Sequence, residues 1–233
     1  MTAAFPSRLA GVVTAPRATF AAVAARPTWV PALALTTLVT FVSAAALFQT
    51  ETGRLALVDQ WERTALAFGQ DVDDARYSVL QRASERGAED AGLTALAGGP
   101  ALTVALAAII YGVFTGLRGG PGSFRQVLAV TAFAGVILAL RQVVVSPLDF
   151  ARETLASPTT LSLMAPGLEE GSPIARFLGA IDAFVVWWVV VLGLGVAAVY
   201  GRPARRVVAE FVGAYVILAL LLVIGMAISG GAA

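Results

Sequence analysis

The sequence predicts an all-α protein, a polytopic membrane helical bundle with about five transmembrane helices and a small extracytoplasmic helical hairpin. Hydrophobic residues make up 58% of the 233 residues and charged residues only 13%, and the mean hydropathy is +0.81. A soluble domain carries nearer a quarter charged residues. Five apolar runs are long enough to cross a hydrocarbon core of ~30 Å at ~1.5 Å per residue. Lipid is therefore the main solvent that we expect the chain to meet.

The positions of the five apolar runs predict an N-terminal segment followed by a transmembrane domain. They cover residues 28–50, 93–117, 126–145, 177–200 and 207–229. Gly98, Gly99 and Pro100 interrupt the second run near its start, so its helix can begin at Pro100, a residue type suited to a first turn. We expect a cytoplasmic or interfacial N-terminal segment (1–27) and a five-helix transmembrane domain (28–233) that contains an outer loop (51–92).

The outer loop carries two amphipathic patterns. Apolar residues recur at helical spacing over residues 55–68 and again over 71–86. Asp71 or Asp73 is placed to cap the second pattern. Together the two patterns predict the helical hairpin outside the membrane.

Arginine placement predicts the orientation. Eight arginines lie in the N-terminal segment and the two short connections, and seven lie in the two long connections, which also hold thirteen of the fifteen acids. The positive-inside rule counts basic residues close to helix ends, and only the first group is dense and free of acids. We therefore expect a multi-pass protein of the cell (inner) membrane, with a cytoplasmic N-terminus and an extracytoplasmic C-terminus.

The N-terminal segment is basic, broken by prolines and apolar in patches. We expect it to lie along the inner interface, with Arg8, Arg17 and Arg26 in contact with lipid phosphates. Its apolar residues would then face the membrane; they are Leu9, Val12, Val13, Phe20 and Val23.

Composition excludes several classes of function. The chain contains no Cys and no His, which removes disulfides, zinc sites and Ser-His-Asp or Cys-His triads. The net charge of +1 gives no basic surplus for binding nucleic acid. We therefore predict no enzyme activity, no catalytic residue, no cofactor and no metal.

Three ionisable residues fall inside the predicted spans and form a candidate intramembrane polar site. They are Arg141, Asp182 and Glu210, and a charge at a helix centre costs about 3 kcal/mol on insertion scales. We expect Arg141 and Asp182 to pair between the third and fourth helices, either as a latch that fixes helix register or as a gate or substrate contact. Glu210 lies four residues after Arg206, which predicts a local pair on one helix face.

Two tryptophans belong to the same candidate site. Trp187 and Trp188 lie midway along the fourth span rather than at an interface, so each indole N–H needs a partner or a cavity. The alternatives are ordinary packing, or a cavity that also includes Tyr111 and Tyr215.

A GxxxG step occurs in the second span at Gly112 and Gly116. Such a step lets two helices approach closely. Packing within the chain and homodimerisation are both compatible with it.

Several short motifs, in order, resemble bacterial members of the Yip (Rab/Ypt-interacting) family of five-span membrane proteins. An N-terminal group comprises Pro16, Arg17, Thr19, Phe20, Arg26, Pro27, Trp29 and Pro31. The stretch 122–130 is similar to that family's turn into its third helix. The region of the fourth helix is matched by Ser157, Pro158, Thr159, Ile181, Asp182, Ala183, Phe184, Trp187, Gly193 and Gly195.

The resemblance implies a five-helix integral membrane protein with a cytoplasmic N-terminus. Eukaryotic relatives are linked to Rab-type small GTPases and membrane traffic, whereas bacterial members imply a membrane location without an assigned activity. The leading hypothesis is a non-catalytic membrane-organising or partner-binding protein, with the lipid bilayer, another membrane protein or a second copy of the chain as partners. The alternative is a small transporter or channel that uses Arg141 and Asp182.

Overall fold

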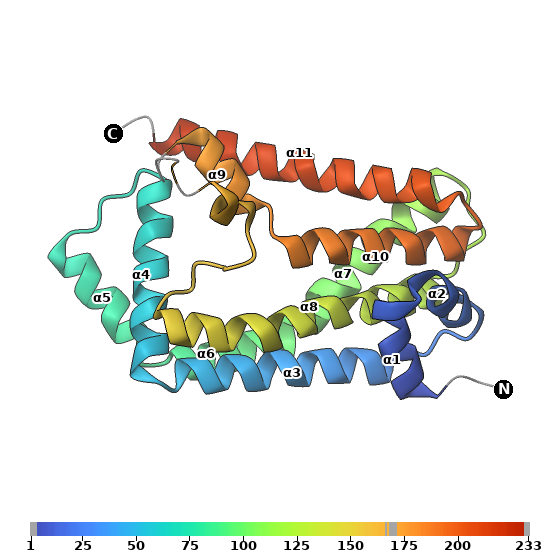
Figure 1. Cartoon of the computed structure of the whole chain (residues 1–233), viewed down its shortest axis with the longest axis horizontal. Helices are drawn as coiled ribbons and strands as arrows, with labels where there is room; N and C mark the ends of the chain where they lie inside the picture. The colour runs from blue at the N-terminus through green and yellow to red at the C-terminus, as the bar shows by residue number, and fades with distance from the viewer. Residues whose placement is uncertain (1–3, 166, 168–171, 231–233) are drawn as a thin grey trace. The chain divides into compact units, whose positions relative to one another are not determined.

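The protein is helical, as the sequence predicts. The computed structural model describes residues 4–165, 167 and 172–230, and every regular element of three or more residues within them is a helix (Figure 1). Within these residues, five helices are long and apolar enough to cross a membrane: Val30–Phe48, Glu89–Leu117, Phe124–Arg152, Ala183–Tyr200 and Ala204–Ser229. The predicted fold class and number of spans are confirmed.

The helices follow one another through short connections. In chain order they are α1 (Phe5–Thr14), α2 (Pro16–Ala25), α3 (Val30–Phe48), α4 (Glu51–Ala67), α5 (Asp74–Ser84), α6 (Gly87–Leu93), η1 (Thr94–Gly98), α7 (Gly99–Tyr111), η2 (Gly112–Leu117), α8 (Phe124–Arg152), η3 (Leu161–Met164), α9 (Pro173–Ala180), α10 (Ala183–Tyr200) and α11 (Ala204–Gly230). Wider π-type turns form η1 and η2, so the second span is one helical rod in which α-helical and π-helical turns alternate.

The chain forms two compact units. Unit 1 comprises Met1–Thr40, Thr94–Arg141 and Phe184–Ala214, and unit 2 comprises Phe41–Leu93, Gln142–Ala183 and Tyr215–Ala233. The helices α3, α8 and α11 each contribute residues to both units.

The core of unit 1 is built around α8. Val127, Val130, Phe133 and Ile137 of α8 are completely buried, together with Leu192 of α10. Small residues alternate with these large ones, which allows neighbouring helices to approach closely. The unit 1 part of α8 is therefore its central helix.

The N-terminal segment is part of this core. Helices α1 and α2 lie together beside the N-terminal end of α8 (Figure 1), where Val12, Phe20 and Val23 are fully buried. The Nε2 of Gln126, in α8, donates to the carbonyl of Ala24 at 3.0 Å. We had expected these apolar side chains to face the membrane; they face protein because Pro16 breaks the segment into two short helices that fold back on each other.

The three arginines of this segment differ in their exposure. Arg17 and Arg26 are exposed, whereas Arg8 is half-buried and its Nη1 donates to the carbonyl of Arg26 at 3.5 Å and to Oγ1 of Thr28 at 3.3 Å. Arg8 therefore holds α1 to the chain that follows α2. Lipid contact by the three arginines stays a prediction.

Unit 2 contains the predicted pair of amphipathic helices, α4 and α5. Thr50 caps α4 by accepting from the amide of Gly53 at 3.0 Å. Asp73 caps α5 by accepting from the amide of Arg76 at 2.8 Å, so the cap is Asp73 rather than Asp71. Side-chain oxygens thus satisfy amides that a helix start leaves unpaired.

Two helix boundaries differ from the sequence-based expectation. We expected the third span to end at Val145, but α8 continues through Pro147 to Arg152, because an internal proline removes one hydrogen bond without forcing the helix to stop. We expected the fourth span to begin at Phe177, but the chain breaks between α9 and α10, around Asp182.

Candidate functional site

The break between α9 and α10 places Asp182 in a hydrogen-bonded cluster of unit 2. Its side chain is only 6% exposed. Its Oδ2 accepts from Oγ of Ser157 at 2.8 Å and from Oγ1 of Thr159 at 2.7 Å. Two hydroxyl donors offset much of the desolvation of a buried carboxylate. Asp182 therefore lies before α10 and not inside the fourth span, where the sequence had placed it.

Backbone hydrogen bonds also stabilise the break between α9 and α10. The amide of Ala183 donates to the carbonyl of Thr159, and the amide of Leu161 to the carbonyl of Ile181, each at 2.9 Å. These bonds make a short antiparallel bridge between the segment after α8 and the start of α10. Two motifs that carry the family resemblance, one at Ser157 and one at Asp182, thus meet in space.

Tyr215 of α11 completes the cluster. Its hydroxyl donates to the carbonyl of Ala180 at 2.9 Å and accepts from the amide of Asp182 at 3.3 Å. A helix break leaves backbone amides and carbonyls without helical partners, and this hydroxyl hydrogen-bonds one amide and one carbonyl. The sequence could not reveal the contact, because it joins residues 33 and 35 positions apart.

Arg141 belongs to unit 1 and Asp182 to unit 2. The pair between them stays a prediction. What the structure adds is that Ser157 and Thr159, which the search for charged residues missed, are hydroxyl partners of Asp182.

Glu210 forms a second polar cluster, in unit 1. The predicted contact with Arg206 is present, at 3.4 Å between Nε and Oε1. Arg118, at the end of η2, makes a shorter bond of 2.6 Å from Nη1 to Oε2, and its guanidinium lies 4.8 Å from the ring centre of Phe114. The Arg118 contact is non-local, so helical spacing could not predict it.

A tyrosine–threonine pair lies in the same unit. Oγ1 of Thr115 and the hydroxyl of Tyr200 are 2.9 Å apart, and Oγ1 of Thr115 donates to the carbonyl of Gly122 at 3.1 Å. The Tyr200 ring also packs against Gly122, where an added Cβ would lie 2.7 Å from a ring carbon. This contact closes the turn between η2 and α8.

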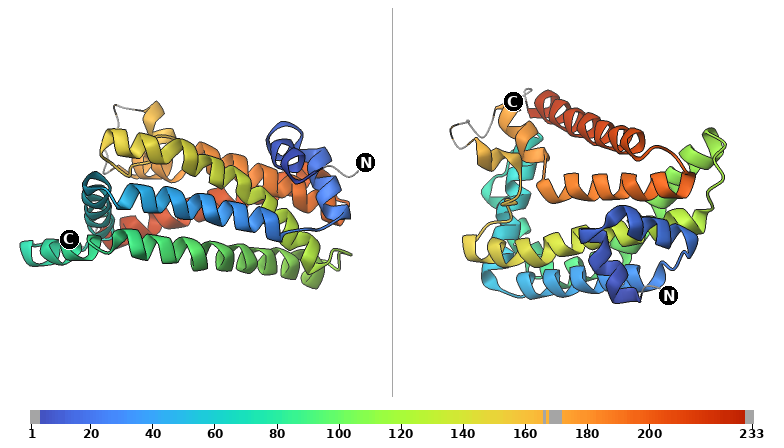
Figure 2. Two further views of the ribbon diagram at one scale, coloured as in Figure 1. Left: turned by 90° about the horizontal axis from the view of Figure 1, so that it is seen from below. Right: turned by 45° about the vertical axis from the view of Figure 1, so that its right-hand side comes forward.

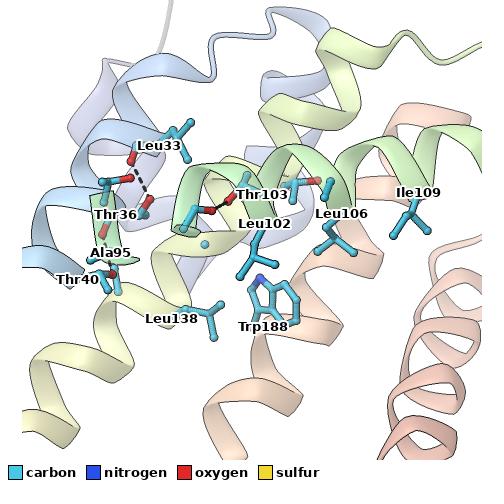
Figure 3. A pocket seen from close by; sticks show the side chains of 16 residues that line it. Leu33, Thr36, Thr40, Ala95, Leu102, Thr103, Leu106, Ile109, Leu138 and Trp188 are labelled. Carbon is cyan, nitrogen blue, oxygen red and sulfur yellow. Dashed lines mark hydrogen bonds between the residues drawn. The ribbon is translucent and has the colours of Figure 1, made fainter. Parts of the chain in front are cut away.

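A cavity of about 490 Å³ lies within unit 1. Figure 2 shows α3 and α7 running side by side, and Figure 3 shows the space that they enclose with α8 and α10. We call it the threonine cavity; its lining includes Thr36, Thr40, Thr103, Thr131 and Trp188. Among the residues that the structure describes, no charged side chain lines it.

The two tryptophans of the candidate site have different surroundings. Trp188 lines the threonine cavity, whereas Trp187 packs against Phe184, with 6.0 Å between ring centres. Tyr111 instead stacks edge-on with Phe124, and Tyr111 and Tyr215 are not part of the cavity lining. The space at Trp188 is therefore not the cavity with Tyr111 and Tyr215 that was one of the two alternatives from the sequence.

The GxxxG step is not used for packing inside the described part of the chain. A Cβ added at Gly112 or at Gly116 would meet no described atom within 4 Å. By contrast, a Cβ at Gly195 in α10 would collide with Val130 and lie 2.9 Å from Cδ1 of Phe20. Close approach inside the chain therefore occurs at Gly195, and the two glycines of the step remain open.

Metal chemistry finds no support among the described side chains, where no three carboxylates come together as a possible set of ligands. This observation concerns residues 4–165, 167 and 172–230 only.

The fold and these clusters define a multi-pass membrane protein whose spanning helices imply a lipid bilayer around them. The sequence profile of the Yip1 domain matches residues 10–227. The chain therefore belongs to the Yip1 domain family, whose members are generally non-catalytic membrane proteins. No curated protein and no solved structure matches it.

Proposed function

We propose that the chain is a non-catalytic membrane protein that acts by helix association, with the open GxxxG face of η2 as its contact surface. The observation that carries the proposal is the empty space at Gly112 and Gly116. Membrane helices gain little from hydrophobic association, so close backbone approach at small residues is the main source of their pairing.

The partner we propose is a second copy of the chain. A two-fold interface uses the same patch on both copies, and two GxxxG faces are complementary to each other. The neighbouring Leu117 is 84% exposed and Ile109 is 64% exposed, so large side chains border the glycines on this rod. They supply the flanking contacts that a glycine-based interface needs.

The test is the oligomeric state of the full chain in lipid. We expect a dimer for the wild type, by single-molecule photobleaching in bilayers of phosphatidylcholine, and a monomer for the double variant Gly112→Leu with Gly116→Leu. The matched control is Gly213→Leu in α11, where an added Cβ also meets no described atom within 4 Å. The control should stay dimeric. A monomeric wild type, or a double variant that dimerises as well as the control, would falsify the proposal.

The transporter alternative has less support. Asp182 accepts from Ser157 and Thr159 in a loop-to-helix junction, which is a structural use of its charge. The threonine cavity is lined by neither Arg141 nor Asp182. An ion or polar substrate crossing the bilayer would need polar groups along such a cavity.

We also propose the orientation that the arginines predict, in the cell (inner) membrane with the N-terminus in the cytoplasm. Arg17, Arg26, Arg118 and Arg202 belong to unit 1, and arginines close to helix ends favour the cytoplasmic side. A reporter that is active only outside the cytoplasm, fused after Ala233, should be active. Activity of a cytoplasm-only reporter at that position would reverse the orientation.

A further inference from the structure

The walls of the threonine cavity present almost no unsatisfied polarity. Thr36, Thr40, Thr103 and Thr131 each donate their hydroxyl proton to a carbonyl three or four residues earlier in the same helix, at 2.9 to 3.0 Å. Three of these bonds are drawn in Figure 3. Each of these hydroxyl protons is thus used within its own helix, so few donors remain to hold water in the space.

Thr37 and Trp188 are the exceptions, since neither side chain hydrogen-bonds another described residue. The indole of Trp188 projects from α10 toward Leu102 of α7, with the ring nitrogen on the side of the cavity (Figure 3). Among the described residues, this N–H donates to no protein acceptor. In an apolar setting, a donor that faces a cavity without an acceptor favours an occupant that supplies one. The cavity therefore suits an occupant that is mostly apolar and carries one oxygen acceptor.

The position of the cavity along the helices identifies the source of that occupant. Thr40 lies ten residues after the start of α3 at Val30, and Trp188 lies five residues after the start of α10 at Ala183. At ~1.5 Å per residue, these are depths of ~15 Å and ~8 Å along helices that cross the bilayer. Molecules available at this depth are lipids. A volume of about 490 Å³ is also in the range of ~300–1,000 Å³ that is usual for ligand sites.

We propose that the threonine cavity binds one acyl chain of a membrane phospholipid, with the carbonyl oxygen of that chain accepting the N–H of Trp188. The methyl groups of the threonines and Leu102 contact the hydrocarbon. The bound lipid differs from those of the surrounding bilayer, because it sits between α3 and α7 and is held by a hydrogen bond. Gly112 and Gly116 do not line the cavity, but Ile109 both lines it and flanks those glycines. The double variant Gly112→Leu with Gly116→Leu should therefore abolish the dimer and leave cavity labelling unchanged, which distinguishes the two proposals.

The experiment uses the full chain in vesicles of phosphatidylcholine, with a small fraction of phosphatidylcholine that carries a diazirine in one acyl chain. A neutral headgroup keeps the exposed arginines from dominating the result. After illumination, peptides should be labelled at Thr36, Thr40 and Thr103 more strongly than at Leu218 and Leu221 of α11, which are 65% and 58% exposed. Uniform labelling along the exposed helices would mean that only the surrounding bilayer had been detected, and would overturn the proposal.

Filling the cavity gives the second arm. Gly135→Leu adds a side chain between α8 and α3, where a Cβ would lie 3.7 Å from Cγ2 of Thr36. Labelling of the cavity residues should fall about tenfold, while Gly213→Leu should leave it unchanged. Ala105→Phe fills the same cavity from α7 and serves if Gly135→Leu does not fold. Full labelling in a folded filling variant contradicts the proposal.

The hydrogen bond is tested at the tryptophans. Trp188→Phe keeps an aromatic ring and removes the donor, so cavity labelling should fall about fivefold, as expected for the loss of one hydrogen bond. Trp187→Phe is the matched control, because Trp187 does not line the cavity. Equal labelling in the two variants would show that the N–H of Trp188 does not hold the lipid.

Discussion

Helices α8 and α11 are both long and apolar, yet one is surrounded by protein and the other is not. Over their most apolar windows the mean hydropathies are 2.1 and 2.7, but 56% of the α8 window is buried in protein and only 11% of the α11 window. The unit 1 part of α8 alternates large residues such as Phe133 with alanine and glycine, whereas α11 carries a run of leucines at 220–222. Between these two helices, the difference in burial follows side-chain size rather than hydropathy.

The contrast predicts that the same substitution has a large effect at one glycine and a small effect at another. Gly195→Val should lower the free energy of unfolding by about 1–3 kcal/mol, because its side chain would overpack against Val130 of α8 and Phe20 of α2. Gly213→Val in α11 should have a much smaller effect, since a Cβ there meets no described atom within 4 Å. Thermal unfolding of both variants in one detergent makes the comparison. Equal losses of unfolding free energy in the two variants would show that the packing against α8 does not make Gly195 more sensitive to substitution than Gly213.

A polar contact of Tyr215 helps to hold α11 in unit 2. Tyr215→Phe keeps the ring and removes the hydroxyl that bonds Ala180 and Asp182, so we expect a loss of about 1–2 kcal/mol. Hydrogen exchange should become faster at the amide of Asp182. Tyr111→Phe is the control, because its ring contact with Phe124 does not need the hydroxyl. Unchanged exchange at Asp182 would show that this anchor is dispensable.

The smallest expected effect is at the other end of α11. Glu210→Gln removes the charge that pairs with Arg118 and Arg206, but both partners of the shorter bond are partly exposed, at 38% and 30%. Exposed pairs contribute about 0.2–1 kcal/mol and weaken with added salt. We therefore expect a loss in this range at low salt that shrinks as salt is raised. A loss that is larger than that of Tyr215→Phe and insensitive to salt would reverse the ranking of the two anchors.

The fold class and number of spans could be predicted because they depend on local composition. A run of about twenty apolar residues has few alternatives to a spanning helix, since its backbone groups need partners inside the segment. The pair of Arg206 with Glu210 and the cap at Asp73 follow from spacing in the same way. The extension of α8 through Pro147 could not be predicted, because a proline is compatible both with a helix end and with a helix that continues.

The candidate site was also predictable only in part. Composition identified Asp182, Glu210 and Trp188 as residues that need partners in an apolar setting, and this much was determined by the sequence alone. Only the tertiary structure decided that the partners of Asp182 include Ser157 and Thr159, that Arg118 reaches Glu210, and that Trp188 opens onto a cavity. The physical reason is that the need for a partner follows from one residue and its surroundings, whereas the partner itself is supplied by segments that only folding brings together.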